Sequence, residues 1–179
     1  MPEGLFGFPR VTSIAPFVDE DAEQEFIVTV NEFVRPPMTQ FFTDLYDKGI
    51  LSTDRMDRIF MELVIREPIK TERKGILGEI EKSIQETTRE VQVSTASYNY
   101  FPNDNIAVVN LVEVKEEFRE AGIGTTIKEK MMDDMEDREV NIAFTRVVSP
   151  EGRSLATRTG FTDDREFFPE DDRILVRRF

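Results

Sequence analysis

A glycine-containing loop joins a largely apolar segment to an amphipathic one in this chain of 179 residues. Ile106 to Val114 predicts a strand, and Gly122 to about Asp137 has apolar residues at helical spacing. Arg119, Gly122 and Gly124 lie at or near the connection. A glycine loop that opens a helix leaves backbone N–H groups unpaired at the positive end of the helix dipole. The segment therefore predicts a strand–loop–helix unit whose loop suits an anion, most often phosphate or pyrophosphate.

Two better-known phosphate loops are excluded by the residues at single positions. The dinucleotide-binding fingerprint needs a third glycine where Ile127 stands. The Walker loop needs a Gly-Lys-Ser/Thr sequence, which this chain lacks. A phosphate loop in this chain must therefore be of another kind.

The loop resembles the acyl-CoA pyrophosphate loop of the GNAT superfamily of N-acetyltransferases. That motif places a valine, an aromatic residue, an arginine or glutamine, and two small residues at fixed spacing after a central strand. All five places are matched here, by Val114, Phe118, Arg119, Gly122 and Gly124. A second segment, Leu155 to Phe161, resembles the Leu-Tyr-x-x-x-Gly-Phe sequence that ends the family's last helix.

This resemblance implies an α+β, three-layer, GNAT-like acyl-CoA N-acyltransferase fold, with a mixed, mostly antiparallel central sheet flanked by helices. It would occupy residues 25–179 as a single domain, preceded by an irregular N-terminal arm over residues 1–24. The implied activity is an acetyl-CoA-dependent N-acetyltransferase. It would move an acetyl group from acetyl-CoA to a primary amine by direct attack in a ternary complex.

The resemblance also implies where acetyl-CoA, the co-substrate, would bind. The pantetheine arm would pair with the central strand as an added strand does, and the pyrophosphate would lie on the loop amides. Ser149 replaces the asparagine that often ends the family's next strand. The cofactor-binding residues implied are Val112, Glu113, Val114, Arg119, Glu120, Ala121, Gly122, Ile123, Gly124, Thr125 and Ser149.

The catalytic groups are less well marked, because Ala156 stands where many family members have the tyrosine that protonates the departing thiolate. Three candidates for acid–base work remain, namely Glu113, Tyr98 and Tyr100. Strict alternation puts Glu113 on the strand face opposite Val112 and Val114, unless a bulge changes the parity. The alternative for Glu113 is a solvated glutamate, and for the tyrosines it is cross-strand packing.

Composition narrows the chemistry further. The chain has no cysteine and no histidine, which excludes disulfides, thiolate metal sites and a cysteine nucleophile, and removes the commonest general base. No apolar run approaches the 18 residues of a membrane span. We therefore expect a cytoplasmic protein without a metal site.

The formal net charge of −13 is spread along the chain. A dispersed acidic surface disfavours binding to nucleic acid and attracts cationic substrates, so we expect a small-molecule or peptide amine as partner. The same surface is typical of a halophilic protein, or of an ordinary acidic protein kept soluble by its charge. Neither the amine nor the oligomeric state follows from the sequence, a homodimer being the commonest assembly.

The remaining elements are expected from apolar periodicity and turn residues. Strands are expected over 25–34, 75–85, 91–101, 140–148, 161–168 and 173–179, with a polar turn over 85–90. Helices are expected from Phe41 to Gly49, from Ser52 to the residue before Pro68, and from Glu151 to Thr159.

Two other functions stay open at this point. One is a catalytically degenerate, GNAT-derived protein that binds acyl-CoA or a partner without turnover, as Ala156 suggests. The other is an acidic interaction protein that mimics nucleic acid to occupy a basic partner.

Overall fold

The computed structural model of the chain describes residues 23–33, 39–52, 55–69, 87–119 and 122–179. Its helices are α1 (Gln40–Asp47), α2 (Ile123–Asp137) and α3 (Pro150–Arg158), with a short 3-10 turn, η2 (Glu116–Phe118). Its strands are β1 (Glu23–Phe33), β2 (Met56–Ile69), β3 (Thr87–Phe101), β4 (Ile106–Val114), β5 (Ile142–Arg146), β6 (Thr162–Asp163) and β7 (Ile174–Arg178).

These strands form one sheet in the order β1-β2-β3-β4-β5-β7-β6. Neighbours from β1 to β4 are antiparallel, β4 and β5 are parallel, and β5, β7 and β6 are again antiparallel. The parallel pair requires a crossover, which α2 supplies. The expected mixed, mostly antiparallel sheet flanked by helices is therefore confirmed.

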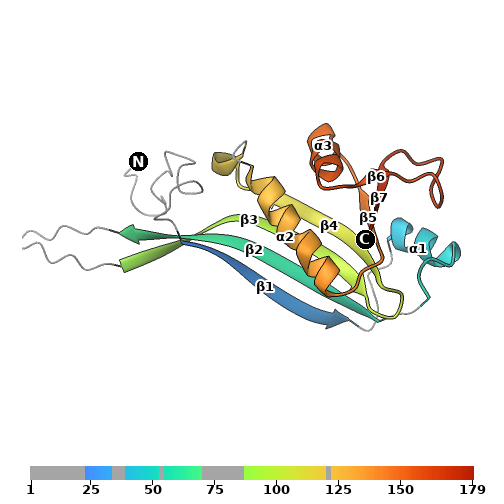
Figure 1. The fold of residues 1–179 in the computed structure, drawn as a ribbon, viewed down its shortest axis with the longest axis horizontal. Helices are drawn as coiled ribbons and strands as arrows, with labels where there is room; N and C mark the ends of the chain where they lie inside the picture. Colours follow the sequence, from blue (N-terminus) through green and yellow to red (C-terminus); the bar gives the residue numbers. More distant parts are fainter. Residues whose placement is uncertain (1–22, 34–38, 53–54, 70–86, 120–121) are drawn as a thin grey trace, which may run out of the picture.

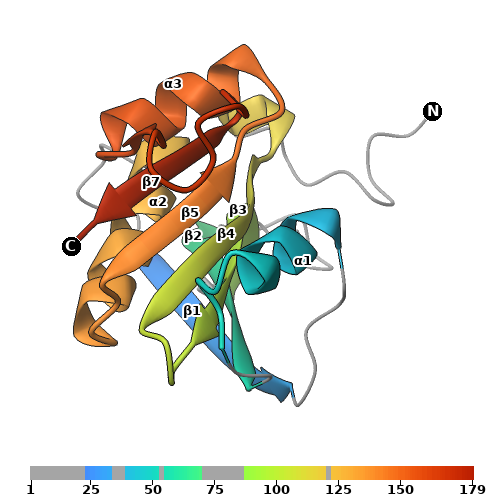
Figure 2. The ribbon, with the colours of Figure 1, turned by 90° about the vertical axis from the view of Figure 1, so that its right-hand side faces the viewer.

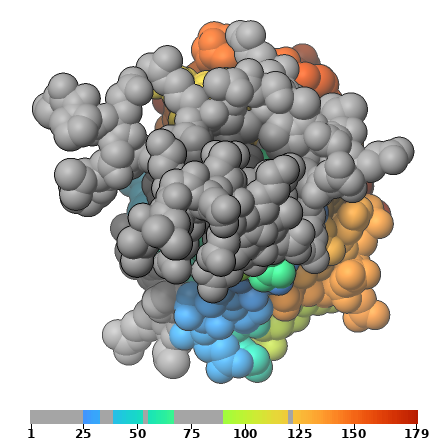
Figure 3. Space-filling view, turned by 90° about the vertical axis from the view of Figure 1, so that its left-hand side faces the viewer, coloured from blue at the N-terminus to red at the C-terminus, as the bar shows by residue number. Residues whose placement is uncertain are grey.

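Helices cover both faces of this sheet (Figures 1 and 2). Alternate residues of β4 show the division, because Ala107 and Val109 pack in the same core as α2, whereas Ile106 and Val108 pack in the same core as α1. The edge strand β1 reaches the surface, as its blue colour in Figure 3 shows, with Val30 45% exposed. The β4 and β5 strands thus lie between two cores, with α2 covering one face and α1 the other.

The expected helix from Ser52 onward is wrong, because this segment forms strand β2. Its apolar residues fit helical spacing, yet the fully buried side chains Ile59, Met61, Leu63 and Ile65 alternate as strand residues do. The register shift between Leu63 and Val64 leaves Val93 of β3 as the extra residue, so the alternation in β2 continues unbroken to Ile65. Pairing with β3 on one side and β1 on the other outweighs the helical pattern.

Pro68 does not end this element either. Among the described residues the ladder between β2 and β1 ends at Arg66, and Pro68 pairs with Thr88 of β3. A proline is tolerated in a strand whose neighbour on one side has ended.

The structure corrects two further expectations, and two others concern segments outside the described residues. Residues 87–90 belong to β3 rather than to a polar turn. Of the strand expected over 161–168, only Thr162–Asp163 forms, because the Asp164 carboxylate accepts hydrogen bonds from the N–H groups of residues 166, 167 and 168 at 2.9–3.1 Å. That carboxylate closes a turn instead. The strand expected over 75–85 and most of the N-terminal arm lie outside the described residues.

The central segment matches its expectation closely. Strand β4 spans Ile106–Val114, and α2 begins directly after Gly122. None of the described helices is long and apolar enough to cross a membrane.

Candidate functional site

The candidate site begins where β4 and β5 separate. The two strands pair in parallel from Ile106 to Val109, where Val109 faces Thr145, and β4 then continues alone on this side to Val114. No strand of the described sheet pairs with this part of the β4 edge. Its backbone N–H and C=O groups are thus available to an extended ligand that carries amide groups.

A cleft of about 180 Å³ opens at this separation. Its walls come from β4, from the end of β5 and the residues after it, and from the start of α3. The lining residues are Val109, Asn110, Leu111, Val112, Lys128, Thr145, Arg146, Val147, Val148, Ser149, Gly152 and Leu155. Leu111 is 42% exposed and Val148 is 94% exposed, and exposed apolar groups beside a cleft suit a ligand that covers them.

A β-bulge at Asn110 sets which β4 residues face α2. Tyr98 of β3 pairs with Val109 and Ser97 pairs with Leu111, so Asn110 is the extra residue of β4. After the bulge Val112 and Val114 pack against the α2 core, as Val109 does before it. The bulge therefore places Val109, which has an odd number, on the same strand face as Val112 and Val114, which have even numbers.

The same bulge leaves Glu113 on the face away from α2. Its side chain is exposed and lines a separate shallow pocket with Gln92, Ser94, Thr95 and Lys115. The Glu113 carboxylate thus lies outside the cleft. Its backbone remains on the unpaired β4 edge.

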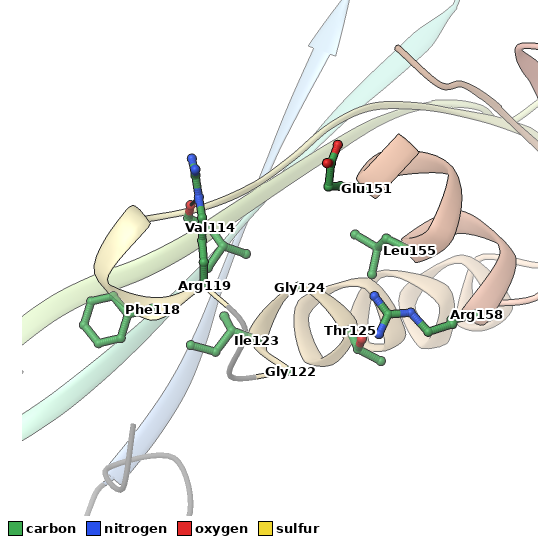
Figure 4. Close-up of a pocket in the computed structure, with 10 residues that line it drawn as sticks. All are labelled: Val114, Phe118, Arg119, Gly122, Ile123, Gly124, Thr125, Glu151, Leu155 and Arg158. Carbon is green, nitrogen blue, oxygen red and sulfur yellow. Dashed lines mark hydrogen bonds between the residues drawn. The ribbon is translucent and has the colours of Figure 1, made fainter. Parts of the chain in front are cut away.

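A second pocket, of about 230 Å³, lies at the N-terminus of α2 (Figure 4). The first backbone bond of the helix runs from the Thr126 N–H to the Gly122 carbonyl, so the N–H groups of the preceding three residues have no partner within the helix. The pocket is lined by Val114, Phe118, Arg119, Gly122, Ile123, Gly124, Thr125, Glu151, Leu155 and Arg158.

The two glycines of the loop have different roles. Gly122 caps the helix with φ +78°, a left-handed conformation that favours glycine. A Cβ on Gly124 would lie 3.5 Å from a methyl of Val114 and 3.6 Å from one of Leu155. Glycine at 124 therefore keeps the approach to the helix terminus open.

Two arginines bring positive charge to this pocket. Arg119 donates from Nε to the Val114 carbonyl at 3.4 Å, and Arg158 reaches the same pocket from the last turn of α3. Figure 4 shows the Arg158 guanidinium drawn beside Thr125. The carboxylate of Glu151 also lines the pocket and opposes an anion there. Sequence reasoning missed Arg158, whose one signal was its place one helical turn after Leu155.

The two pockets adjoin at Leu155, which lines both, and together they are called the groove below. Ser149 helps to place this leucine, because its Oγ accepts a hydrogen bond from the Gly152 N–H at 3.0 Å and caps α3. Most of the predicted cofactor-binding residues line this groove. The exceptions are Glu113, whose side chain faces away, and Glu120 and Ala121, which lie outside the described residues.

The two candidate tyrosines do not line either pocket of the groove. The Tyr98 hydroxyl donates to Asp134 of α2, and the Tyr100 hydroxyl donates to the Arg138 carbonyl at 2.8 Å. Burial raises the pKa of Tyr98, and the Asp134 carboxylate raises it further; burial likewise raises the pKa of Tyr100. Both hydroxyls are placed to hold the C-terminal end of α2, at the far end from the glycine loop.

Lys128 is a further groove residue that the sequence reasoning did not single out. It lies on α2 between the buried Ile127 and Met131, is 3% exposed and lines the β4–β5 cleft. The one sequence signal for it was a lysine that lies among the apolar residues of the helix.

Among the described residues no group of three acidic side chains is arranged to hold a metal ion.

Comparison with known proteins finds no matching family model and no matching curated protein. Solved structures of similar fold include Tetrahymena GCN5, at 11% identity over 68% of each chain and a TM-score of 0.45. The PaiA N-acetyltransferase of Thermoplasma acidophilum, solved with coenzyme A, is 15% identical over 51% of this chain and 59% of its own, with a TM-score of 0.43. An acetyltransferase from Bacillus cereus is 11% identical over 80% of this chain and 96% of its own, with a TM-score of 0.46.

Proposed function

We propose that this chain binds acetyl-CoA in the groove between β4, β5, α2 and α3 and transfers its acetyl group to a primary amine. The observation that carries the proposal is that the two pockets adjoin at Leu155. A helix N-terminus with two arginines meets an unpaired strand edge, and Leu155 lines both. Acyl-CoA combines the two matching features, a pyrophosphate and an extended arm with amide groups.

The chain's own groups support binding and orientation. The loop residues and the two arginines line the pocket that we assign to the phosphates, and the free edge of β4 offers N–H and C=O groups to the arm. An amine that attacks the thioester carbonyl forms a C–N bond as the C–S bond breaks, and the thiolate takes up the proton that the nitrogen loses. In this proposal, backbone N–H groups of the free β4 edge near the Asn110 bulge polarise that carbonyl.

The amine acceptor is a separate part of the proposal. The net charge of −13 attracts a cationic substrate, which supports a small-molecule or peptide amine that is protonated in solution. Such an amine must lose a proton before it attacks, so acetylation should quicken as pH rises toward the pKa of the amine.

The first test is thermal unfolding with and without acetyl-CoA, in low salt and in molar potassium chloride. A ligand at about 100 times its dissociation constant adds roughly 2.7 kcal/mol to the free energy of unfolding. For a domain of this size the midpoint should rise by about 5–10 °C. Salt screens the repulsion between an acidic protein and an anionic ligand, so we expect the larger shift in high salt. The absence of a shift in both salts would overturn the proposal.

A second candidate is an acyl-CoA-binding protein without turnover. Three observations favour it, namely the buried Ala156, the Glu113 side chain outside the groove, and the engaged Tyr98 hydroxyl. The two functions separate in one assay, in which acetyl-CoA is offered with a panel of amines and free CoA is measured. Binding without CoA release for any amine would support the second candidate.

Two charges of opposite sign provide a matched test of the phosphate pocket. Arg158→Gln should weaken CoA binding roughly tenfold, the loss expected for one charge-assisted hydrogen bond. Glu151→Gln removes the opposing carboxylate and should strengthen binding by about two- to fivefold. Isothermal titration with CoA measures both. If both variants changed the affinity for CoA in the same direction and by the same factor, the phosphates would bind elsewhere.

A further inference from the structure

Lys128 is a buried amine in the cleft that the proposed function assigns to the acyl arm. Its side chain is 3% exposed and lines the cleft together with Asn110, Leu111 and Val112 of the free β4 edge. Lys128 lies six positions after Gly122, which corresponds to a rise of about 9 Å along the helix axis. An extended pantetheine arm is longer than this, so an arm that starts at the α2 terminus reaches past Lys128.

The charge of Lys128 is not matched by an acidic group. No carboxylate of the described residues forms an ion pair with it, and its Nζ lies 4.7 Å from the centre of the Phe161 ring. The half-buried cation that caps α2 has such a partner, because Arg138 is paired with Asp134 at 2.8 Å. Burial lowers the pKa of Lys128 to about 8, so a substantial fraction of the amine is neutral near that pH.

A simple packing role does not account for a lysine at this position. Its neighbours in the core are apolar, among them Ile127, Met131 and Met132, and a methionine would fill the same volume without a buried charge. Burying an ammonium that has no carboxylate partner is costly, and its cation–π contact with the Phe161 ring is the one stabilising contact of its charge that the described residues provide. Acylation removes this cost, because it turns the ammonium into a neutral amide.

We propose that Lys128 is a self-acylation site, whose amine accepts the acetyl group of acetyl-CoA bound in the same cleft. The inference rests on the proposed function, since it needs the thioester in the groove. The neutral Nζ attacks the thioester carbonyl, the C–N bond forms and the C–S bond breaks. CoA leaves as the thiolate and takes up the proton that the nitrogen loses. The product is Nε-acetyl-Lys128, and no other reactant is needed.

The test is to incubate the full chain with acetyl-CoA near pH 8 without any amine, and to map acetylated lysines by mass spectrometry. Lys130 is the matched control, because it lies two residues away on the same helix and does not line the cleft. We expect Lys128 to be acetylated at least about tenfold faster than Lys130. The rate should saturate with acetyl-CoA, and free CoA should inhibit it, as a bound donor requires.

Two variants keep the test decisive. Lys128→Arg keeps the charge but not the nucleophile, and Lys128→Met fits the apolar core, so both should fold and neither should be labelled at this position. Thermal unfolding with acetyl-CoA on the unchanged chain separates the two ways of failing. A midpoint shift without label on Lys128, or with equal label on Lys130, would overturn the inference and leave acyl-CoA binding intact. No midpoint shift would overturn the proposed function as well.

Discussion

Gly124→Val should weaken CoA binding by about 100-fold or more, a loss of roughly 2.7 kcal/mol of binding free energy. The reason is steric. A Cβ at this position would already touch Val114 and Leu155 at 3.5 and 3.6 Å, so the two methyl groups of valine would press on them or enter the pocket at the α2 terminus (Figure 4). A phosphate would then no longer reach the loop N–H groups. Isothermal titration with CoA measures the loss.

Gly124→Ala is the matched control for this change. Its single Cβ makes ordinary contacts with the same two side chains, and alanine favours the helix. We therefore expect a chain at least as stable as the original that binds CoA less than about tenfold more weakly. Unchanged binding in the valine variant, with its folding verified by thermal unfolding, would mean that the phosphates do not lie on this loop.

The loop was predictable from sequence because its physical requirements are local. The left-handed cap favours glycine at 122, and a small residue at 124 suits the close approach of the helix to Val114 and Leu155, so these residue types indicate the local geometry. The β4–α2 unit follows from the same local signals, and its boundaries match the expectation within one residue.

The errors arose where partners distant in sequence decide the structure. The segment of Met56 to Ile65 satisfies helical and strand periods at once, and only pairing with β1 and β3 selects the strand. The turn at Asp164 depends on where one carboxylate meets three N–H groups, which residue periodicity does not show.

The site was predictable only in part, for a related reason. Residues of the loop and β4 are marked by the motif, whereas Arg158 and Lys128 enter the groove because α3 and the inner face of α2 border it. The side of the strand that Glu113 faces depends on the bulge at Asn110, which a single sequence does not locate. Tyr98 and Tyr100 are aligned by the β3 register with the far end of α2, so their hydroxyls meet helix groups instead of the groove.

Asp134→Ala should lower the free energy of unfolding by about 3 kcal/mol, because it removes the acceptor shared by two groups. The Tyr98 hydroxyl and the Arg138 guanidinium both donate to this carboxylate, and the aspartate and arginine side chains are only 19% and 26% exposed. The variant leaves a buried hydroxyl and a half-buried cation without their partner. For a chain of this length the unfolding midpoint should fall by about 6–12 °C.

Asp133→Ala is the control, since it changes the net charge by the same amount at an exposed position on the same helix, and should alter stability by less than about 0.5 kcal/mol.

Tyr98→Phe should lower the free energy of unfolding by about 1 kcal/mol, the net value of one hydrogen bond. Stability and acetyl transfer measured on the folded variants distinguish the two roles considered for Tyr98. A tyrosine that holds the end of α2 predicts lower stability with CoA affinity and acetyl transfer retained, whereas a catalytic acid predicts lost transfer at unchanged stability. The hydrogen bond to Asp134, made outside the groove, favours the first result.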